Sequence, residues 1–180
     1  MRFKQMRLVV TKHTGLFARL VAVVLVAVAV NKLLIANFVV LGPSMYPNYI
    51  HGDRVIIETV SPSLGEFSRG TLIVFRDPED SNGTCFKRIV AIPGDVVEVI
   101  DNQVFINGFE VEDSQTKGPD RVEPVLVPAG GYFVLGDNRE FSRDSRSWPQ
   151  QFINRDQIVG SYLARYWSAD RQQAPPPELN

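Results

Sequence analysis

The chain is poor in the residues that build disulfide frameworks and zinc sites. Its 180 residues include one cysteine, Cys85, and two histidines, His13 and His51. A single cysteine excludes an intrachain disulfide. The two histidines are far apart and show no HExxH-type spacing, so the sequence does not supply the ligand set of a structural or catalytic zinc site. We therefore expect no metal centre.

Net charge is almost absent, at −1, but it is unevenly distributed. Residues 1–19 carry five basic and no acidic side chains, so the rest of the chain sums to −6 (−1 minus +5). The five are Arg2, Lys4, Arg7, Lys12 and Arg19. Because the excess of positive charge is confined to this leader, no basic patch for nucleic acid is expected.

Long hydrophobic runs are also scarce, and the longest lies directly after the leader. Leu20–Val30 is an unbroken apolar run of 11 residues, which alone is too short to span a bilayer. With its neighbours it extends over residues 16–36, close to the roughly 20 residues that a spanning helix needs. Arg19 and Lys32 lie near its ends, where long basic side chains reach the interface. The basic leader predicts a cytoplasmic N-terminus.

A cleaved signal peptide is the alternative interpretation of this segment. Ala27-Val28-Ala29 resembles the Ala-x-Ala site at which a signal peptide is cleaved. These alanines, however, lie inside the apolar run, and apolar residues continue through Phe38–Leu41. We therefore expect a retained anchor. The expected division is a basic cytoplasmic leader at 1–15, a transmembrane anchor at 16–36, an extracytoplasmic catalytic β-domain at 37–167 and a disordered tail at 168–180.

Short runs rich in Val, Ile, Thr and aromatic residues dominate the body of the chain and favour an all-β fold. Turn residues separate them, among them Asp101-Asn102 and Asn107-Gly108, which are hairpin signals. The polar segment Glu112–Pro124 is expected to be a surface loop. The predicted strands are Arg54–Val60, Thr71–Phe75, Cys85–Ile92, Val96–Ile100, Gln103–Ile106, Phe109–Val111, Gly131–Leu135 and Gln157–Trp167.

A candidate nucleophile lies just after the apolar segment, in Gly42-Pro43-Ser44-Met45-Tyr46-Pro47. A serine hydroxyl is a weak nucleophile and needs a neighbouring base. Since His13 falls in the leader, a histidine base could come only from His51. Lys87 is the other candidate. A lysine accepts a proton only when burial lowers its pKa from about 10.4.

Lys87 lies in a run where such burial is plausible. Within Cys85–Val90 the only other charged residue is Arg88, and strand alternation places Lys87 and Arg88 on opposite faces. Ser44 and Lys87 together predict a serine nucleophile with a lysine general base, held next to a membrane.

Four stretches resemble, in the same order, the motifs of bacterial type I signal peptidases. These are the membrane-bound Ser-Lys leader peptidases of serine protease family S26. The resemblance covers most of the chain from about Val40 to Trp167. The four stretches are Gly42–Pro47, Gly52–Val55, Lys87–Asp95 and Gly136–Trp148.

The resemblance implies a fold and a function. The fold is an all-β catalytic domain of coiled antiparallel sheets with one N-terminal transmembrane helix. The function is removal of N-terminal signal peptides from exported preproteins by cleavage after small residues, Ala-x-Ala. The implied location is the inner membrane, with the catalytic domain on the extracytoplasmic side. Preproteins and membrane lipid are the implied partners, and no cofactor is needed.

The resemblance also implies roles for individual residues. Ser44 is the nucleophile, Lys87 the general base, and Ser142 a hydrogen-bonding partner that orients Lys87. The backbone N–H of Ser44 is one oxyanion donor. Part of the family takes the second donor from a serine two residues earlier, but this chain has Gly42 there, so a backbone or water donor must serve.

Further implied roles concern structure and specificity. Asp144 pairs with Arg146, and Asp137 with Arg88, as structural braces. The shallow pockets for small substrate residues are lined by Phe38, Val40 and Phe86. Two departures from the family pattern, Asn48 for a threonine and Pro149 for a glycine, put loop shape in doubt.

Three alternatives remain open on the sequence alone. One is a specialised peptidase of the same family that matures conjugative pilin. Another is a membrane-tethered β-domain that binds peptides without cleaving them. The last is a self-cleaving repressor-type Ser-Lys protein, against which the membrane anchor and the missing DNA-binding domain argue.

Overall fold

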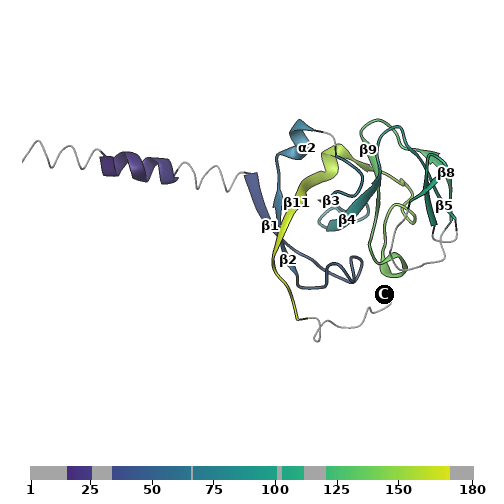
Figure 1. Ribbon diagram of the computed structural model, residues 1–180, viewed down its shortest axis with the longest axis horizontal. Helices are drawn as coiled ribbons and strands as arrows, with labels where there is room; N and C mark the ends of the chain where they lie inside the picture. Colours follow the sequence, from purple (N-terminus) through teal and green to yellow (C-terminus); the bar gives the residue numbers. More distant parts are fainter. Residues whose placement is uncertain (1–15, 26–33, 66, 101–102, 112–120, 171–180) are drawn as a thin grey trace, which may run out of the picture. The chain divides into compact units, whose positions relative to one another are not determined.

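The structure is a computed structural model of the chain (Figure 1). It describes residues 16–25, 34–65, 67–100, 103–111 and 121–170. The chain divides into two units, Met1–Ile35 and Ala36–Asn180. The expected leader at 1–15 lies outside the described residues, as do 26–33 of the expected anchor and 171–180 of the expected tail.

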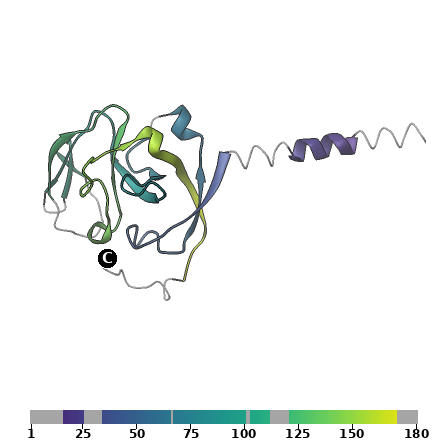
Figure 2. The ribbon, with the colours of Figure 1, turned by 180° about the vertical axis from the view of Figure 1, so that it is seen from behind.

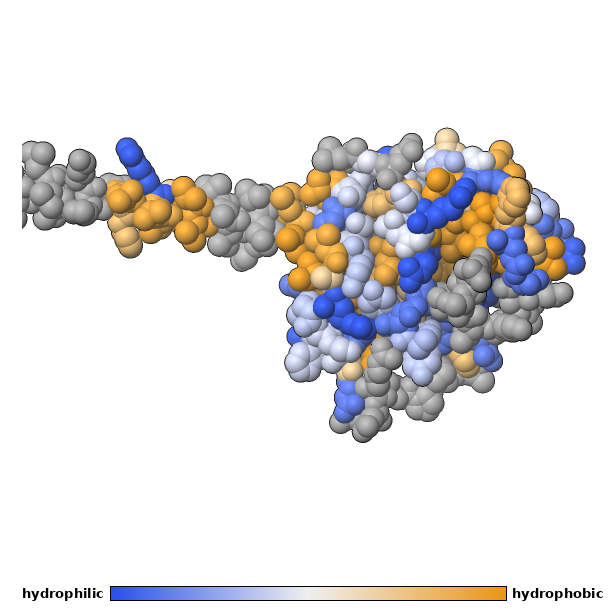
Figure 3. All heavy atoms as spheres, in the orientation of Figure 1, coloured by the Kyte–Doolittle hydropathy of each residue, from blue (hydrophilic) through white to orange (hydrophobic). Residues whose placement is uncertain are grey.

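In the first unit, residues 16–25 form a helix whose large apolar side chains are exposed (Figure 3). Among the described residues, no helix combines the length and the hydropathy needed to cross a membrane.

The second unit is mostly β-sheet, as the sequence predicts. The described strands are β1 (Ile35–Val39), β2 (Arg54–Glu58), β3 (Leu72–Arg76), β4 (Thr84–Ala91), β5 (Val96–Ile100), β6 (Gln103–Ile106), β7 (Phe109–Val111), β8 (Val122–Leu126), β9 (Gly131–Leu135), β10 (Ile153–Asn154) and β11 (Ile158–Trp167). The helical pieces are short: α2 (Ser61–Leu64) and the 3-10 turns η1 (Arg139–Phe141) and η2 (Arg155–Gln157).

The strands form two sheets (Figures 1 and 2). The larger has seven strands in the order β1-β2-β11-β3-β4-β9-β10, and the smaller has four in the order β7-β6-β5-β8. The pairings within β2–β11, β3–β4 and β4–β9 are antiparallel. In the larger sheet, sequence neighbours β3 and β4 pair directly, whereas β11 returns from the far end of the chain to lie between β2 and β3.

The larger sheet is covered on both faces, which explains its unbroken apolar strands. On β3, Ile73 and Phe75 pack into one core cluster, while Leu72 and Val74 pack into another. All five residues of β9 are likewise buried. Each fully buried Ile, Leu or Phe side chain stabilises the fold by about 1.5–3 kcal/mol, so these two strands form a rigid support for what lies beside them.

Three observed strands are missing from the sequence prediction: β1, β8 and the two-residue β10, which pairs with β9. β1 was expected as the end of the anchor and the apolar stretch after it, but Ile35–Val39 is a strand at the edge of the larger sheet. β8 begins at Val122, inside the segment expected to be a loop, and contains Pro124. Proline lacks the N–H needed in a central strand, and β8 accommodates it because it lies at the edge of the smaller sheet.

The fold brings three parts of the chain together: the β1–β2 segment, strand β4 and the segment that follows β9. The segment between β1 and β2 carries Ser44, and β4 carries Lys87. β9 pairs with β4, and the chain leaving β9 turns back toward the β1–β2 segment. There the backbone N–H of Asn138 donates to the carbonyl oxygen of Ser44 at 2.9 Å. A site built from these parts depends on the order of strands in the larger sheet.

Candidate active site

Ser44 lies on a loop that is closed at its base by backbone hydrogen bonds. The Val40 N–H donates to the Asp53 carbonyl and the Gly52 N–H to the Val40 carbonyl, both at 2.8 Å. Gly42 has φ +77°, a left-handed conformation that favours glycine. Met45, next to the serine, is completely buried and fixes the loop to the core. The loop therefore presents Ser44 from a defined backbone rather than from a free turn.

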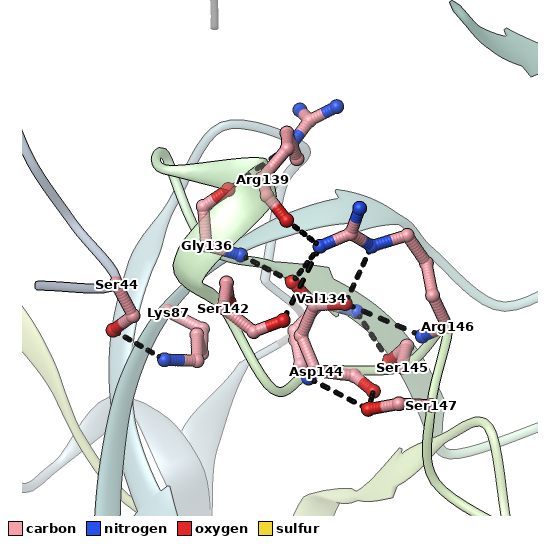
Figure 4. A network of polar contacts seen from close by, with 10 residues as sticks. All are labelled: Ser44, Lys87, Val134, Gly136, Arg139, Ser142, Asp144, Ser145, Arg146 and Ser147. Carbon is pink, nitrogen blue, oxygen red and sulfur yellow. Dashed lines mark hydrogen bonds and ion pairs between the residues drawn. The ribbon is translucent and has the colours of Figure 1, made fainter. Parts of the chain in front are cut away.

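Lys87 reaches this serine from β4. Its backbone pairs with Ile73 of β3, and its side chain is 5% exposed. The Lys87 Nζ lies 2.5 Å from the Ser44 Oγ (Figure 4). This is hydrogen-bonding distance, so the two side chains are placed for direct proton transfer.

Burial lowers the pKa of the Lys87 amine below its ordinary value. Nearby acidic groups act in the opposite direction, including Cys85, Asp144, Asp77 and Asp137, but burial is the largest effect. A lysine with a lowered pKa is neutral in a larger fraction of molecules near neutral pH and can then accept a proton from Ser44.

Arg88, on the opposite face of β4 from Lys87, binds Asp137, which follows β9 in the chain. Its Nε and a terminal nitrogen each donate to the carboxylate at 2.8 Å, which makes the pair bidentate. The Asp137 side chain is 2% exposed. Asn48, from the serine loop, donates to the same carboxylate at 2.8 Å. Asp137 thus links the lysine strand to the serine loop.

Arg146 and Asp144 form a second, more deeply buried pair (Figure 4). Their side chains are 2% and 0% exposed, and both guanidinium–carboxylate contacts are 3.0 Å or shorter. Asp144 also accepts the Gly136 N–H at 3.0 Å, and Arg146 donates to the Arg139 carbonyl at 2.7 Å. This pair holds the segment after β9 in place around Ser142.

Ser142 does not bond to Lys87 in this structure. Its Oγ is buried and has no hydrogen-bond partner among the described residues. Ser142 packs instead against Gly136, where a Cβ atom would lie 2.5 Å from the Ser142 Cβ. The orienting hydrogen bond expected from the sequence is therefore absent here, although Ser142 lies on the segment that the buried pair holds.

Asn138 and Gly136 contact the serine loop, although the sequence predicts no role for either residue. The side chain of Asn138 donates to the Pro43 carbonyl at 3.1 Å, next to the nucleophile. Gly136 packs so closely on Ser44 that an added Cβ would lie 2.5 Å from the serine carbonyl oxygen. Both act on backbone atoms, which no sequence pattern identifies. Their only signal was the dense run of polar residues in Gly136–Trp148.

The residues expected to line substrate pockets belong to one apolar cluster. Val40 and Phe86 are buried in it, and Phe38 packs against it. The Phe38 and Phe86 ring centroids are 5.9 Å apart, and Tyr49 meets Phe86 edge-on at 5.2 Å. Burial, aided by a hydrogen bond with Tyr162, raises the pKa of Tyr49. Tyr49 therefore stays neutral beside this apolar cluster.

His51 and Cys85 have other partners. The Nδ1 atom of His51 accepts the Gly42 N–H at 3.1 Å, so this ring contacts the loop backbone rather than the Ser44 hydroxyl. The Cys85 thiol donates to Asp77 at 3.3 Å, and burial raises its pKa to about 12. The part of the chain that is described contains no cluster of three or more His, Cys, Asp or Glu side chains suited to a metal ion.

Comparison with known proteins gives consistent matches. The family described as signal peptidase, peptidase S26, matches residues 13–167. A probable signal peptidase I-2 of Synechocystis sp. is 33% identical over 160 residues, covering 84% of this chain and 72% of that protein. Signal peptidase IB of Staphylococcus aureus is 31% identical over 161 residues, covering 77% of this chain and 81% of that protein. A crystal structure of a signal peptidase I from Enterococcus faecalis is 27% identical, with a TM-score of 0.45, and covers 55% of this chain and 98% of that chain.

Proposed function

The chain belongs to the signal peptidase family, peptidase S26, and on that premise we propose that it removes signal peptides from exported preproteins, with Ser44 as nucleophile and Lys87 as general base. The enzyme is accordingly a serine hydrolase. The observation that carries the proposed roles is the 2.5 Å contact between the Lys87 Nζ and the Ser44 Oγ, made by a lysine residue that is 5% exposed.

The reaction follows from this contact. Neutral Lys87 takes the hydroxyl proton as the Ser44 Oγ attacks the carbonyl carbon of the scissile bond. The Ser44 N–H is one donor to the tetrahedral oxyanion. Because Gly42 has no side-chain donor, a second donor must come from backbone or water. Lys87 then gives its proton to the leaving amine, which departs as the new N-terminus of the mature protein.

The ester that remains on Ser44 is hydrolysed by the reverse sequence. Lys87 takes a proton from a water molecule, the resulting hydroxide attacks the ester carbonyl, and the Ser44 oxygen leaves with the proton that Lys87 returns. The signal peptide departs with a free carboxylate. Every proton transfer uses the same buried amine, so no cofactor is required.

Preference for small residues before the cleaved bond is proposed to come from Phe38, Val40 and Phe86. Phe38 and Phe86 are large rings in contact with each other, and Val40 is buried beside them. We expect pockets beside such closely packed side chains to be shallow, which would suit an Ala-x-Ala sequence.

We also propose that residues 16–34, which precede β1, anchor the enzyme in the inner membrane, as a single pass with the catalytic domain outside the cytoplasm. The exposed apolar side chains of residues 16–25 and the basic leader support this topology. Signal peptides reach an anchored enzyme by diffusion in the membrane plane. Ser142, Asp144, Arg146, Asp137 and Arg88 are proposed to support the dyad.

The test is cleavage of a preprotein with an Ala-x-Ala site by the detergent-solubilised chain, with the cut located by mass spectrometry. We expect wild type and Ser81→Ala, a matched change at an exposed turn serine, to give one cut after the second alanine. Ser44→Ala and Lys87→Met should give none while remaining folded. Product from Lys87→Met at the wild-type rate would remove Lys87 from the mechanism. A folded wild type that cleaves nothing would favour a dedicated substrate or a binding role.

A further inference from the structure

Asn138 holds the backbone on both sides of the nucleophile. It follows β9, immediately before η1, and is 3% exposed. Its backbone N–H donates to the Ser44 carbonyl at 2.9 Å. Its side-chain Nδ2 donates to the Pro43 carbonyl at 3.1 Å. One residue therefore fixes the two peptide groups that flank the Ser44 Cα.

The second of these bonds has a consequence for the Ser44 N–H. The Pro43 carbonyl and the Ser44 N–H belong to the same planar peptide group. Among the described residues the only cis peptide is Tyr46-Pro47, so this group is trans and its C=O and N–H point in opposite directions. A donor that fixes the Pro43 carbonyl thus fixes the direction of the Ser44 N–H on the other side.

The same bond polarises the peptide group. A hydrogen bond accepted by a carbonyl withdraws electron density from its amide nitrogen and strengthens the N–H as a donor. This matters more here than where a serine side chain supplies a second oxyanion donor, because Gly42 contributes no hydroxyl. The Ser44 N–H is the one oxyanion donor assigned so far, and its direction and strength depend on how the Pro43 carbonyl is held.

The surroundings of Asn138 leave this arrangement little freedom. A Cβ at Gly136 would lie 2.5 Å from the Ser44 carbonyl oxygen, so the two backbones are already in close contact. The Gly136 N–H is in turn held by the buried Asp144 carboxylate at 3.0 Å. The buried ion pair of Asp144 and Arg146 therefore helps to hold the segment that carries Asn138.

We propose that Asn138 is a positioning residue that aims the Ser44 N–H at the oxyanion and strengthens it as a donor. The inference rests on the proposed function, since an oxyanion forms only if Ser44 attacks a carbonyl. The proposal also explains why the side chain at position 138 is an amide. It must donate an N–H to the Pro43 carbonyl, and a carboxylate in its place would repel that oxygen.

Asn138→Ala and Asn138→Asp in the full-length, detergent-solubilised chain test this role, with Asn154→Ala as the matched control. Asn154 also bonds to backbone, but it does so at the start of η2, away from the serine loop. Removing an oxyanion donor itself typically costs 10²–10³-fold in rate, and misaiming one should cost about tenfold or more. We expect kcat to fall by that factor in Asn138→Ala and further in Asn138→Asp. KM should stay within about twofold, because the oxyanion exists only in the transition state.

A spectroscopic measurement supplies a result that does not depend on turnover. The ¹⁵N resonance of the Ser44 amide should move upfield in Asn138→Ala, because its carbonyl loses a hydrogen bond, and should not move in Asn154→Ala. An unmoved Ser44 resonance, or a kcat within twofold of wild type, would overturn the inference. A fall in kcat accompanied by a rise in KM and a lower melting temperature would also overturn it, because that pattern indicates a merely structural role. If wild type itself cleaves nothing, the proposed function fails, and the Ser44 resonance alone decides whether Asn138 sets this amide.

Discussion

Gly136→Ala should damage stability and catalysis together, because position 136 has no room for a methyl group. A Cβ there would lie 2.5 Å from the Ser44 carbonyl oxygen and 2.5 Å from the Ser142 Cβ. Ordinary contacts between such atoms begin near 3.4 Å, so one or both neighbours must retreat by about 1 Å. The serine carbonyl can move only with the backbone of the nucleophile loop.

The size of the effect follows from that displacement. Overpacking a close contact typically costs about 1–3 kcal/mol in the free energy of unfolding. For a domain of this size that corresponds to a melting temperature lower by about 2–12 °C. A nucleophile misplaced by about 1 Å loses roughly 10²-fold in rate, so kcat should fall by about two orders of magnitude.

The assay combines thermal unfolding with the kinetics of preprotein cleavage. Gly65→Ala is the matched control, since Gly65 has an ordinary φ of −143° and a Cβ there would meet nothing within 4 Å. The control should melt and cleave like wild type. A Gly136→Ala protein that does the same would refute the claim that β9 and the serine loop are in close contact.

Two further predictions concern buried charge. Burial lowers the pKa of Lys87 in the folded protein below the unfolded value of about 10.4. Between these two values the folded lysine holds a proton less often than the unfolded lysine does, so the protein becomes more stable as the pH rises. The free-energy cost of burying the charged amine is therefore full at low pH and vanishes above about pH 10.4. Lys87→Met should therefore melt at a higher temperature than wild type at pH 6 but not at pH 10.5, and an equal difference at both pH values would contradict the assignment. Arg146→Met leaves the buried Asp144 carboxylate without its partner and should lower the free energy of unfolding by about 3–5 kcal/mol in denaturant titrations. The exposed pair of Arg121 and Glu123 is the control, because Arg121→Met should cost about 1 kcal/mol or less.

Strands whose signals are local could be predicted from the sequence almost to the residue. The observed β5, β6 and β7 have the predicted bounds, since turn dipeptides such as Asn107-Gly108 mark where those hairpins reverse. β9 also matches, as an apolar run between glycines. Alternation and turn chemistry depend on neighbours in sequence, and these elements need nothing more.

The three strands that the sequence did not predict, β1, β8 and β10, depend on neighbours in space. Ile35–Val39 follows an apolar run in the sequence and is a strand because it pairs with a sheet that the sequence cannot reveal. β8 contains Glu123 and Pro124, which predict a loop, and only its position at a sheet edge makes them acceptable. The order of the seven strands is equally non-local, and the position of β11 between β2 and β3 has no sequence signature.

The candidate site divides in the same way. Ser44 and Lys87 were recognisable because their residue types are unusual in those settings, and the structure places them in contact. Asn138 and Gly136 were not recognised, because what matters is their contact with the carbonyls of Pro43 and Ser44. A contact with a backbone carbonyl does not depend on the residue type at that position, so the sequence does not indicate it.

The account rests on a neutral, buried Lys87 acting as the base, and the pH dependence of kcat/KM tests that most directly. The measurement compares wild type with His51→Gln, since His51 is the one other candidate base outside the leader. The account predicts that kcat/KM rises with pH along a limb whose pKa lies below about 10.4, the ordinary value for lysine, and that His51→Gln keeps that limb. A limb that disappears in His51→Gln, or one that stays at the ordinary lysine value, would contradict it.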